Sequence, residues 1–410
     1  MTHSQHANES IKPLEGGNVA SPRGFSVGAT YVGMKTFGDN EKLDLAILLS
    51  ESPCVGAGVF TQNKFAAAPV HLSRENLEEA QPRAIIVNSG CANAGVGDQG
   101  MIDARAMTSI AASKLNLSRS EILIASTGVI GAELPMGIIQ NGIESISLDS
   151  SGHDFAKAMM TTDTHPKEFA VEIEIEGVKG TIAGAAKGVG MIHPDMATML
   201  SFITTDLAID SGFLKSVIKE AADQTFNMVS VDGDTSTNDT LIILANGLAK
   251  NTPIDGGTNG EKFSDALFEV CKALAKMIAR DGEGATKLLE VQVEQAQSLP
   301  DARIAARTIT ASPLLKAAIY GNDPNWGRVL MALGRSGANI AENKVSIFMN
   351  DICMMEAGKP IPFFRDAAIT AMQKPEVVIR VQLGLGDGNA TAWGCDLTEE
   401  YVHINGAYTT

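Results

Sequence analysis

The sequence predicts an α/β protein, and two recurring patterns are the reason. Short apolar runs suited to buried strands occur at residues 43–51, 84–87 and 122–125. Between and after them lie segments with apolar residues at helical spacing, of which residues 263–280 are the clearest. At 410 residues the chain is long enough for one large domain or two medium ones.

Composition excludes several classes of function. The net charge of −16 and an aromatic share of only 5% disfavour nucleic-acid partners, which need a basic groove and stacking rings. No apolar run reaches the ~18 residues of a membrane span, and the polar N-terminus has no apolar core of a secretory signal. The five cysteines are odd in number, widely spaced and without a CxxC pair, which argues against disulfides or zinc and fits a reducing cytoplasm.

In the first part of the chain we expect strands over residues 24–32, 43–51 and 57–63, then a helix within residues 66–80 that Ser73 caps. The strand at 84–87 is expected to break at Asn88–Gly90. The small and amide residues from Asn88 to Gly97 suit either a carboxylate site or a glycine turn, and the residues alone favour the turn. Cys91 in this loop has no neighbouring His, so we expect a small buried cysteine rather than a nucleophile.

The strand at 122–125 precedes a second informative loop, Ser126-Thr127-Gly128. A loop after a buried strand presents backbone N–H groups and a hydroxyl together, which is what an oxyanion hole requires. The same residues also suit an ordinary Thr-Gly turn, and without further information the turn is the stronger interpretation. Three helices are expected over 103–115, 136–146 and 153–160, and a hairpin over 171–186.

The second half continues the alternation. We expect strands at 200–206, 288–293, 345–351, 376–386 and around Trp393, and helices at 212–226, 263–280, within 300–320 and at 326–333. The loop Ser230–Thr240 is dense in Asp and hydroxyl residues but lacks the Gly and Glu placement of an EF-hand, so we expect a hydrogen-bonded loop lining the active site rather than a metal site. No GxGxxG or Walker motif is present.

The stretch from Lys187 to Asp206, KGVGMIHPDMATMLSFITTD, holds the most informative residue. Thr198 lies where a turn-prone run enters an apolar strand. A threonine hydroxyl is a poor nucleophile, but an N-terminal threonine can use its own α-amine, with a pKa of about 7.7–8.0, as the base. His193 offers either a base or a plain turn residue, and an α-amine would make a histidine base unnecessary.

The string KGVGMIHPDMATML closely resembles the self-cleavage segment of the ornithine acetyltransferase (glutamate N-acetyltransferase) family of arginine biosynthesis. STGVIG and YGNDPNWGRVLMALGRSG are also typical of that family, and the resemblance covers nearly the whole chain. It implies autocatalytic cleavage between Ala197 and Thr198. An α chain of residues 1–197 and a β chain of residues 198–410 would then stay interlocked around one active site.

The resemblance also implies roles for individual residues. Thr198 would be the nucleophile that carries the acetyl group, and Thr127 and Gly128 would stabilise the oxyanion. The remaining residues would bind substrate, with Glu283 at its cationic end: Thr162, Thr164, Lys187, Glu283, Asn405 and Thr410.

The function implied is ping-pong transfer of acetyl from N2-acetylornithine to glutamate, with acetyl-CoA as a further possible donor and with no metal or organic cofactor. The implied fold is a layered α/β sandwich of the N-terminal-nucleophile type, with helices outside two mixed sheets, in an α2β2 heterotetramer. Two other functions fit the residues: an aminopeptidase or amidase of the same fold, which passes the acyl group to water, and a non-catalytic amino-acid-binding protein that never cleaves.

Overall fold

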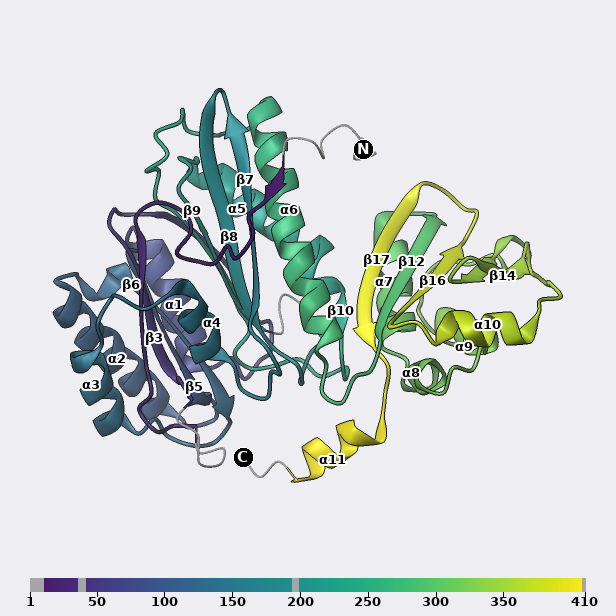
Figure 1. The fold of residues 1–410 in the computed structure, drawn as a ribbon, viewed down its shortest axis with the longest axis horizontal. Helices are drawn as coiled ribbons and strands as arrows, with labels where there is room; N and C mark the ends of the chain where they lie inside the picture. The colour runs from purple at the N-terminus through teal and green to yellow at the C-terminus, as the bar shows by residue number, and fades with distance from the viewer. Residues whose placement is uncertain (1–10, 36–41, 194–198, 408–410) are drawn as a thin grey trace.

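Three mixed or antiparallel-rich β-sheets with helices against them make up the protein (Figure 1). The computed structural model describes residues 11–35, 42–193 and 199–407. The predicted α/β class and the layered arrangement of mixed sheets and helices are confirmed. The resemblance implied two sheets, whereas the described residues form three.

A six-stranded sheet occupies the centre. Its strands, in spatial order, are β1 (Lys12–Pro13), β7 (Lys167–Ile175), β8 (Val178–Lys187), β9 (Leu200–Thr205), β11 (Thr240–Ala245) and β4 (Val55–Phe60). β8 pairs antiparallel with β9, and Lys187 lies opposite Leu200. The chain therefore leaves and re-enters the same sheet on either side of residues 194–198. The strand predicted at 200–206 is confirmed as β9, whereas β11 was not predicted. Every residue of β9 and β11 is buried, including the polar Ser201, Thr204 and Thr205.

A four-stranded sheet packs against one face of the central sheet. Its strands, in spatial order, are β2 (Phe25–Thr30), β3 (Leu45–Ser50), β5 (Ala84–Cys91) and β6 (Ile122–Val129). The core between the two sheets contains Phe155 and Phe202, whose rings meet edge to face at 5.5 Å. Phe155 lies on α4 (Gly152–Met159), which packs against strands of both sheets.

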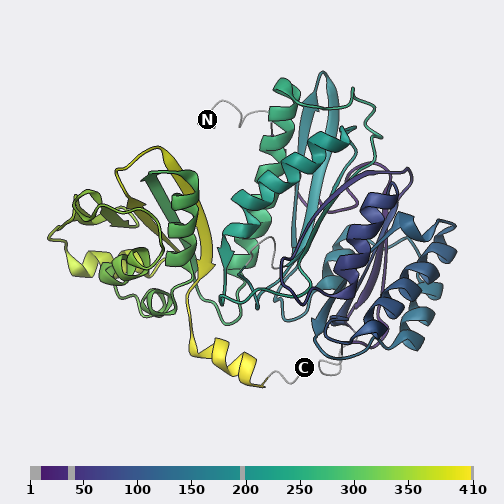
Figure 2. The same ribbon diagram turned by 180° about the vertical axis from the view of Figure 1, so that it is seen from behind.

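A seven-stranded sheet forms the other end of the molecule. Its strands, in spatial order, are β10 (Val229–Ser230), β17 (Gly388–Cys395), β12 (Leu288–Ala296), β16 (Glu376–Gln382), β13 (Ser346–Met349), β14 (Ile352–Glu356) and β15 (Lys359–Pro360). The long helix α6 (Gly257–Arg280) packs against β7 and β8 and also against β17 and β12, so it joins this sheet to the central one. Figure 2 shows α6 in this position, seen from behind.

The other helices, except the last of them, pack on the sheets or on one another. They are α1 (Ala68–Glu79), α2 (Asp98–Leu115), α3 (Met136–Ser145), α5 (Ser211–Gln224), α7 (Leu299–Thr310), α8 (Pro313–Tyr320), α9 (Trp326–Gly334), α10 (Arg365–Met372) and α11 (Glu399–Ala407), with short 3-10 turns at Arg119–Glu121, Phe226–Met228 and Glu342–Lys344. α1, α2 and α3 lie beside the four-stranded sheet. None of the described residues of α11 is buried. In Figure 1, α11 lies below the other elements, between the seven-stranded sheet and the four-stranded sheet.

Two local predictions were wrong. The strand at 84–87 does not break at Asn88–Gly90: β5 runs on to Cys91, because β6 continues beside it and supplies parallel partners as far as Val129. Ser73 does not cap α1, which begins at Ala68 with Pro69 in its first turn. Ser73 is instead buried inside the helix, and its hydroxyl bonds the backbone of Ile124 in β6.

Candidate active site

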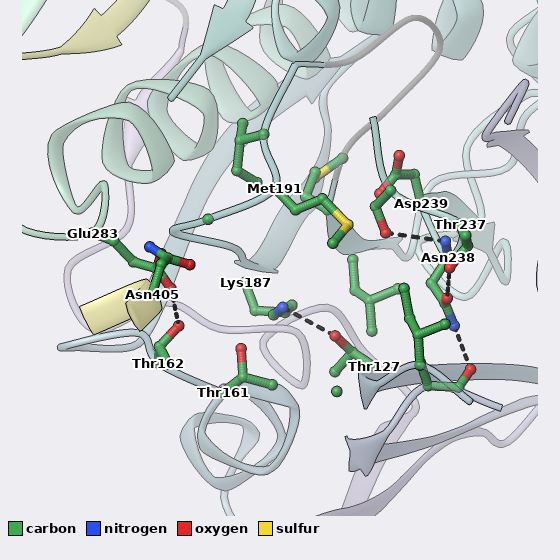
Figure 3. Close-up of a pocket in the computed structure, with 18 residues that line it drawn as sticks. Thr127, Thr161, Thr162, Lys187, Met191, Thr237, Asn238, Asp239, Glu283 and Asn405 are labelled. Carbon is green, nitrogen blue, oxygen red and sulfur yellow. Dashed lines mark hydrogen bonds between the residues drawn. The ribbon is translucent and has the colours of Figure 1, made fainter. Parts of the chain in front are cut away.

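A cavity of about 370 Å³ lies where the six-stranded sheet, the four-stranded sheet, the loop after α6 and α11 meet (Figure 3). It is bounded by the end of β6, the end of β8, the turn after α4, the loop before β11, the loop after α6, and α11. The residues that line it are Ala92, Thr127, Gly128, Ile130, Thr161, Thr162, Lys187, Gly190, Met191, Ile192, Met199, Leu200, Ser236, Thr237, Asn238, Asp239, Glu283 and Asn405.

Thr127 and Gly128 reach this cavity from the end of β6. They lie within the strand rather than in the loop that the sequence predicted, because β6 stays paired with β5 beyond Ala125. Gly128 has a φ of +128°, and a Cβ there would lie 2.3 Å from the carbonyl carbon of Gly90. Only glycine fits so close to a neighbouring backbone. The position therefore fixes the Thr127–Gly128 backbone against the cavity wall.

Lys187 is the last residue of β8, and its buried ammonium crosses to the other sheet. Nζ donates a hydrogen bond of 3.0 Å to Oγ1 of Thr127 (Figure 3). Burial lowers the pKa of Lys187, and the charge of Asp163 opposes this shift. The contact places a cation beside a hydroxyl at the centre of the cavity.

The turn after α4 divides its threonines between two environments. Thr161 and Thr162 line the cavity, and the Thr162 hydroxyl donates to Oε1 of Glu283 at 2.8 Å. Thr164 faces away from it, since its hydroxyl and its backbone N–H both bond the carboxylate of Asp281. Of the two threonines that the resemblance singled out, the structure thus brings only Thr162 to the cavity, and adds Thr161.

Glu283 faces Lys187 from the loop after α6. Its Oε2 accepts a bond of 2.7 Å from Nδ2 of Asn405, which α11 supplies. The backbone N–H of Glu283 bonds the carbonyl of Val189 at 2.9 Å. Gly190 makes room for the carboxylate, because a Cβ there would lie 2.5 Å from Oε2. Three segments far apart in the sequence are therefore held together around one carboxylate.

A buried cluster of charged side chains next to the cavity, Asp163, Lys167 and Asp281, was not predicted from the sequence. Lys167 donates to Asp163 at 2.6 Å and to Asp281 at 2.7 Å, and all three side chains are almost fully buried. Asp163 also accepts the backbone N–H groups of Gly188 at 2.8 Å and Thr161 at 3.0 Å. The i, i+4 spacing of Asp163 and Lys167 was visible, but nothing in the sequence tied Asp281 to them.

The loop Ser230–Thr240 lines the cavity, as its composition predicted, but two of its residues were not singled out. Asn238 donates to the carbonyls of Ala92 at 2.6 Å and Ser126 at 2.8 Å, and so ties the loop to the four-stranded sheet. Asp239 is buried in the wall of the cavity. Burial raises its pKa well above the ordinary value, and hydrogen bonding from Ser236 and the charge of Lys187 only partly offset this.

Three predicted site residues, Ala197, Thr198 and Thr410, lie outside the described residues. Met199 and Leu200, which follow Thr198 in the chain, line the cavity. Cys91 and His193, the other candidate nucleophile and base, do not line the cavity. Cys91 is buried with its thiol toward the carbonyl of Ala132, and burial raises the pKa of that thiol. The Nδ1 atom of His193 lies 3.0 Å from the Ser230 hydroxyl.

Chemically, the cavity sets a cation and a hydroxyl on one wall against a carboxylate on the other. It thus suits a small zwitterionic molecule with a reactive carbonyl. Within the described parts of the chain, no group of three or more His, Cys, Asp or Glu side chains is placed to hold a metal ion. A search of the same residues finds no helix with the length and apolar character needed to cross a membrane.

Comparison with known proteins gives consistent results. A family model described as the ArgJ family matches residues 26–410. The chain is 52% identical to the arginine biosynthesis bifunctional protein ArgJ of Dehalococcoides mccartyi, across 98% of this chain and 99% of that protein. It is 50% identical to the protein of the same name from Symbiobacterium thermophilum, across 96% and 99%. The crystal structure of the ArgJ protein from Bacillus halodurans is 42% identical with a TM-score of 0.50, covering 50% of this chain and 98% of that one.

Proposed function

Because the chain belongs to the ArgJ family, we propose that it is the acetyltransferase of arginine biosynthesis that moves an acetyl group from N2-acetylornithine to glutamate. The observation that carries the proposal is the arrangement of charge in one cavity. Lys187, bonded to Thr127, and Glu283 line the same cavity. A carboxylate suits the cationic end of an ornithine-type substrate, and an ammonium suits its α-carboxylate. Both ends of the substrate are thereby matched.

The chemistry begins with the chain cutting itself. The Thr198 hydroxyl attacks the carbonyl of Ala197, the peptide C–N bond breaks as the acyl group passes to the oxygen, and water then hydrolyses the resulting ester. The products are an α chain of residues 1–197 and a β chain of residues 198–410, which remain associated. The freed α-amine of Thr198 accepts the proton of its own hydroxyl, since N-terminal amines ordinarily have a pKa of about 7.7–8.0. The oxygen then attacks the acetyl carbonyl, while Thr127 and Gly128 stabilise the oxyanion. Ornithine leaves, glutamate enters, and its amine takes the acetyl group.

Other residues would position the two substrates. Thr162 and Asn405 both bond Glu283, so they hold the carboxylate that receives the cationic end. Thr164, which bonds Asp281, would act through the turn that carries Thr161 and Thr162. Thr410 would complete the substrate site from the C-terminal end, as the family resemblance implies.

We also propose acetyl-CoA as a second acetyl donor, since the relatives are named bifunctional. No metal or organic cofactor is needed for acyl transfer through a hydroxyl. The antiparallel pairing of β8 with β9 supports two chains that stay interlocked after the cut. The α2β2 assembly is proposed from the family resemblance alone. Five free cysteines are typical of a reducing compartment, and we place the enzyme in the cytoplasm.

The test combines intact-mass analysis under denaturing conditions with an acetyl-transfer assay, on the wild type and on Thr198→Ala. We expect two fragments, residues 1–197 and 198–410, and glutamate-dependent loss of acetylornithine, both absent from the variant. If the chain is cut but acetylornithine is hydrolysed at the same rate with and without glutamate, the enzyme is an amidase instead. A single uncut chain with full transferase activity would overturn the mechanism.

A further inference from the structure

A second cavity, of about 620 Å³, lies behind the wall of the first. The wall is the antiparallel bridge between Ile192 and Thr235. On one side, Met191, Ile192 and Ser236 face the cavity described above. On the other side, His193 and Thr235 face the second cavity. The two cavities therefore share a backbone wall but have different linings.

The second cavity is lined by an excess of positive charge. Arg303 and Arg307 lie one turn apart on α7, and Arg335 follows the end of α9. Asp223 is the one acidic residue among the lining residues that the structure describes. Its Oδ1 already accepts a bond of 2.9 Å from Nδ2 of Asn227. The chain as a whole has a net charge of −16, so three arginines around one cavity make its local charge opposite in sign to that of the protein.

Two of these arginines are not satisfied by the protein. Within the described ranges, neither the guanidinium of Arg303 nor that of Arg335 has an ion pair or a hydrogen bond. Two other arginines show what such pairing looks like in this protein: Arg105 pairs with Glu75 at 3.0 Å, and Arg365 with Asp323 at 3.7 Å. The donors of Arg303 and Arg335 are thus available to a ligand.

The rest of the lining suits an organic molecule rather than a bare ion. Apolar surface comes from Met228, Pro300 and Ile304, and neutral hydrogen-bonding groups come from Gln62 and Thr308. The volume falls within the range of cavities that bind small organic ligands. A guanidinium presents its donors in a planar fork that matches a carboxylate or a phosphate.

We propose that the second cavity is a binding site for a small organic polyanion, whose carboxylate or phosphate groups Arg303 and Arg335 bind. The proposal does not depend on the acetyl-transfer reaction, because it concerns a different cavity and is tested by binding alone. A ligand held there would lie against the back of the wall that carries Met191 and Ile192 into the first cavity.

The experiment is calorimetric titration of the full chain with an organic bisphosphate, fructose 1,6-bisphosphate, and, separately, with citrate. Arg303→Gln and Arg335→Gln each remove one guanidinium. Arg119→Gln, at an exposed arginine in the 3-10 turn before β6, is the matched control for the same change in charge. We expect saturable binding to the wild type and to Arg119→Gln. Each of the two cavity variants should bind about tenfold more weakly or worse. Whichever probe binds more tightly identifies phosphate or carboxylate as the group recognised.

Melting midpoints without probe show whether each variant is folded. Arg335 is exposed at a helix end, so its replacement tests the site even if Arg303→Gln unfolds. Absence of saturable binding of both probes at millimolar concentration would overturn the proposal. So would equal affinities for the wild type, the control and both cavity variants.

Discussion

The contact between Lys187 and Thr127 determines what the threonine hydroxyl can do. A lysine ammonium only donates hydrogen bonds. Oγ1 of Thr127 therefore accepts from Nζ of Lys187, and the hydroxyl hydrogen is left to donate to another group. Because Thr127 lines the cavity, an oxyanion formed there is a suitable acceptor.

Replacing Thr127 by Val tests this role. The shape of the strand is kept but the donor is lost, so kcat for acetyl transfer should fall by about 10²–10³-fold, with little change in KM. Thr391→Val, on a partly exposed strand of the seven-stranded sheet, should leave both constants unchanged. A variant with normal kcat and a raised KM would mean that Thr127 binds substrate without stabilising charge.

At this scale the sequence identified residues mainly through family motifs. Lys187 and Glu283 look like surface residues in the sequence, and only the resemblance placed them in a site. Asn238, Asp239 and Asp281 were not identified, because the sequence does not show which carboxylates and amides are buried. Their burial depends on contacts between segments more than a hundred residues apart, such as Asn238 with Ser126.

Among the helices, α11 is unusual because it supplies a residue to the site although none of its own described residues is buried. Its Val402 is 69% exposed. Its contacts with the protein include Asn405 to Glu283 and the Tyr401 hydroxyl to Asp232 at 3.4 Å. Gly284 lies directly under the start of the helix, and a Cβ there would lie 2.7 Å from the backbone nitrogen of Tyr401.

The Gly284→Ala variant should therefore shift α11 and weaken the bond between Asn405 and Glu283. We expect KM for acetylornithine to rise about tenfold, comparable with the loss of one hydrogen bond to a charged group. Gly247→Ala is the matched control: both glycines have a φ of +71°, but the nearest atom to a Cβ at Gly247 is 3.6 Å away. If both variants change KM equally, backbone strain rather than α11 is responsible.

The periodic elements were largely predictable, and the exceptions have physical causes. α6 and the hairpin of β7 and β8 follow from strong apolar periodicity and a glycine turn. β5 and β6 extend past their apolar cores, since each supplies the other's partners, and such pairing is not encoded locally. α11 was missed because a helix that buries no face carries no apolar stripe.

For the whole molecule, the sequence predicted the class but not the number of layers. Strands of the six-stranded sheet come from residues 12 to 245, and the order of such a sheet depends on long-range pairing. The cluster of Asp163, Lys167 and Asp281 lies where these layers meet. It joins the turn after α4 to the start of β7, the end of β8 and the end of α6.

This cluster should make stability depend on acid pH. Burial alone would raise the pKa of Asp163, but the charges of Lys167 and Lys187 and the hydrogen bonds to the carboxylate prevail and lower it from 3.8 to about 2. A carboxylate whose pKa is lower in the folded state stabilises it above the unfolded pKa. That stabilisation is lost as the pH falls through the folded pKa. The loss should amount to about 2 kcal/mol between pH 5 and pH 2.

Urea unfolding of the wild type and Asp163→Asn at several pH values measures this contribution. At pH 7 the variant should be less stable by about 3–5 kcal/mol, because Lys167 and Lys187 lose a buried counter-charge. The gap should narrow by about 2 kcal/mol toward pH 2, since the wild-type carboxyl is then protonated and also uncharged. Asp387→Asn, an exposed carboxylate in the same protein, should show no such convergence. A gap that stays constant from pH 7 to pH 2 would mean that Asp163 is held by its hydrogen bonds rather than by its charge.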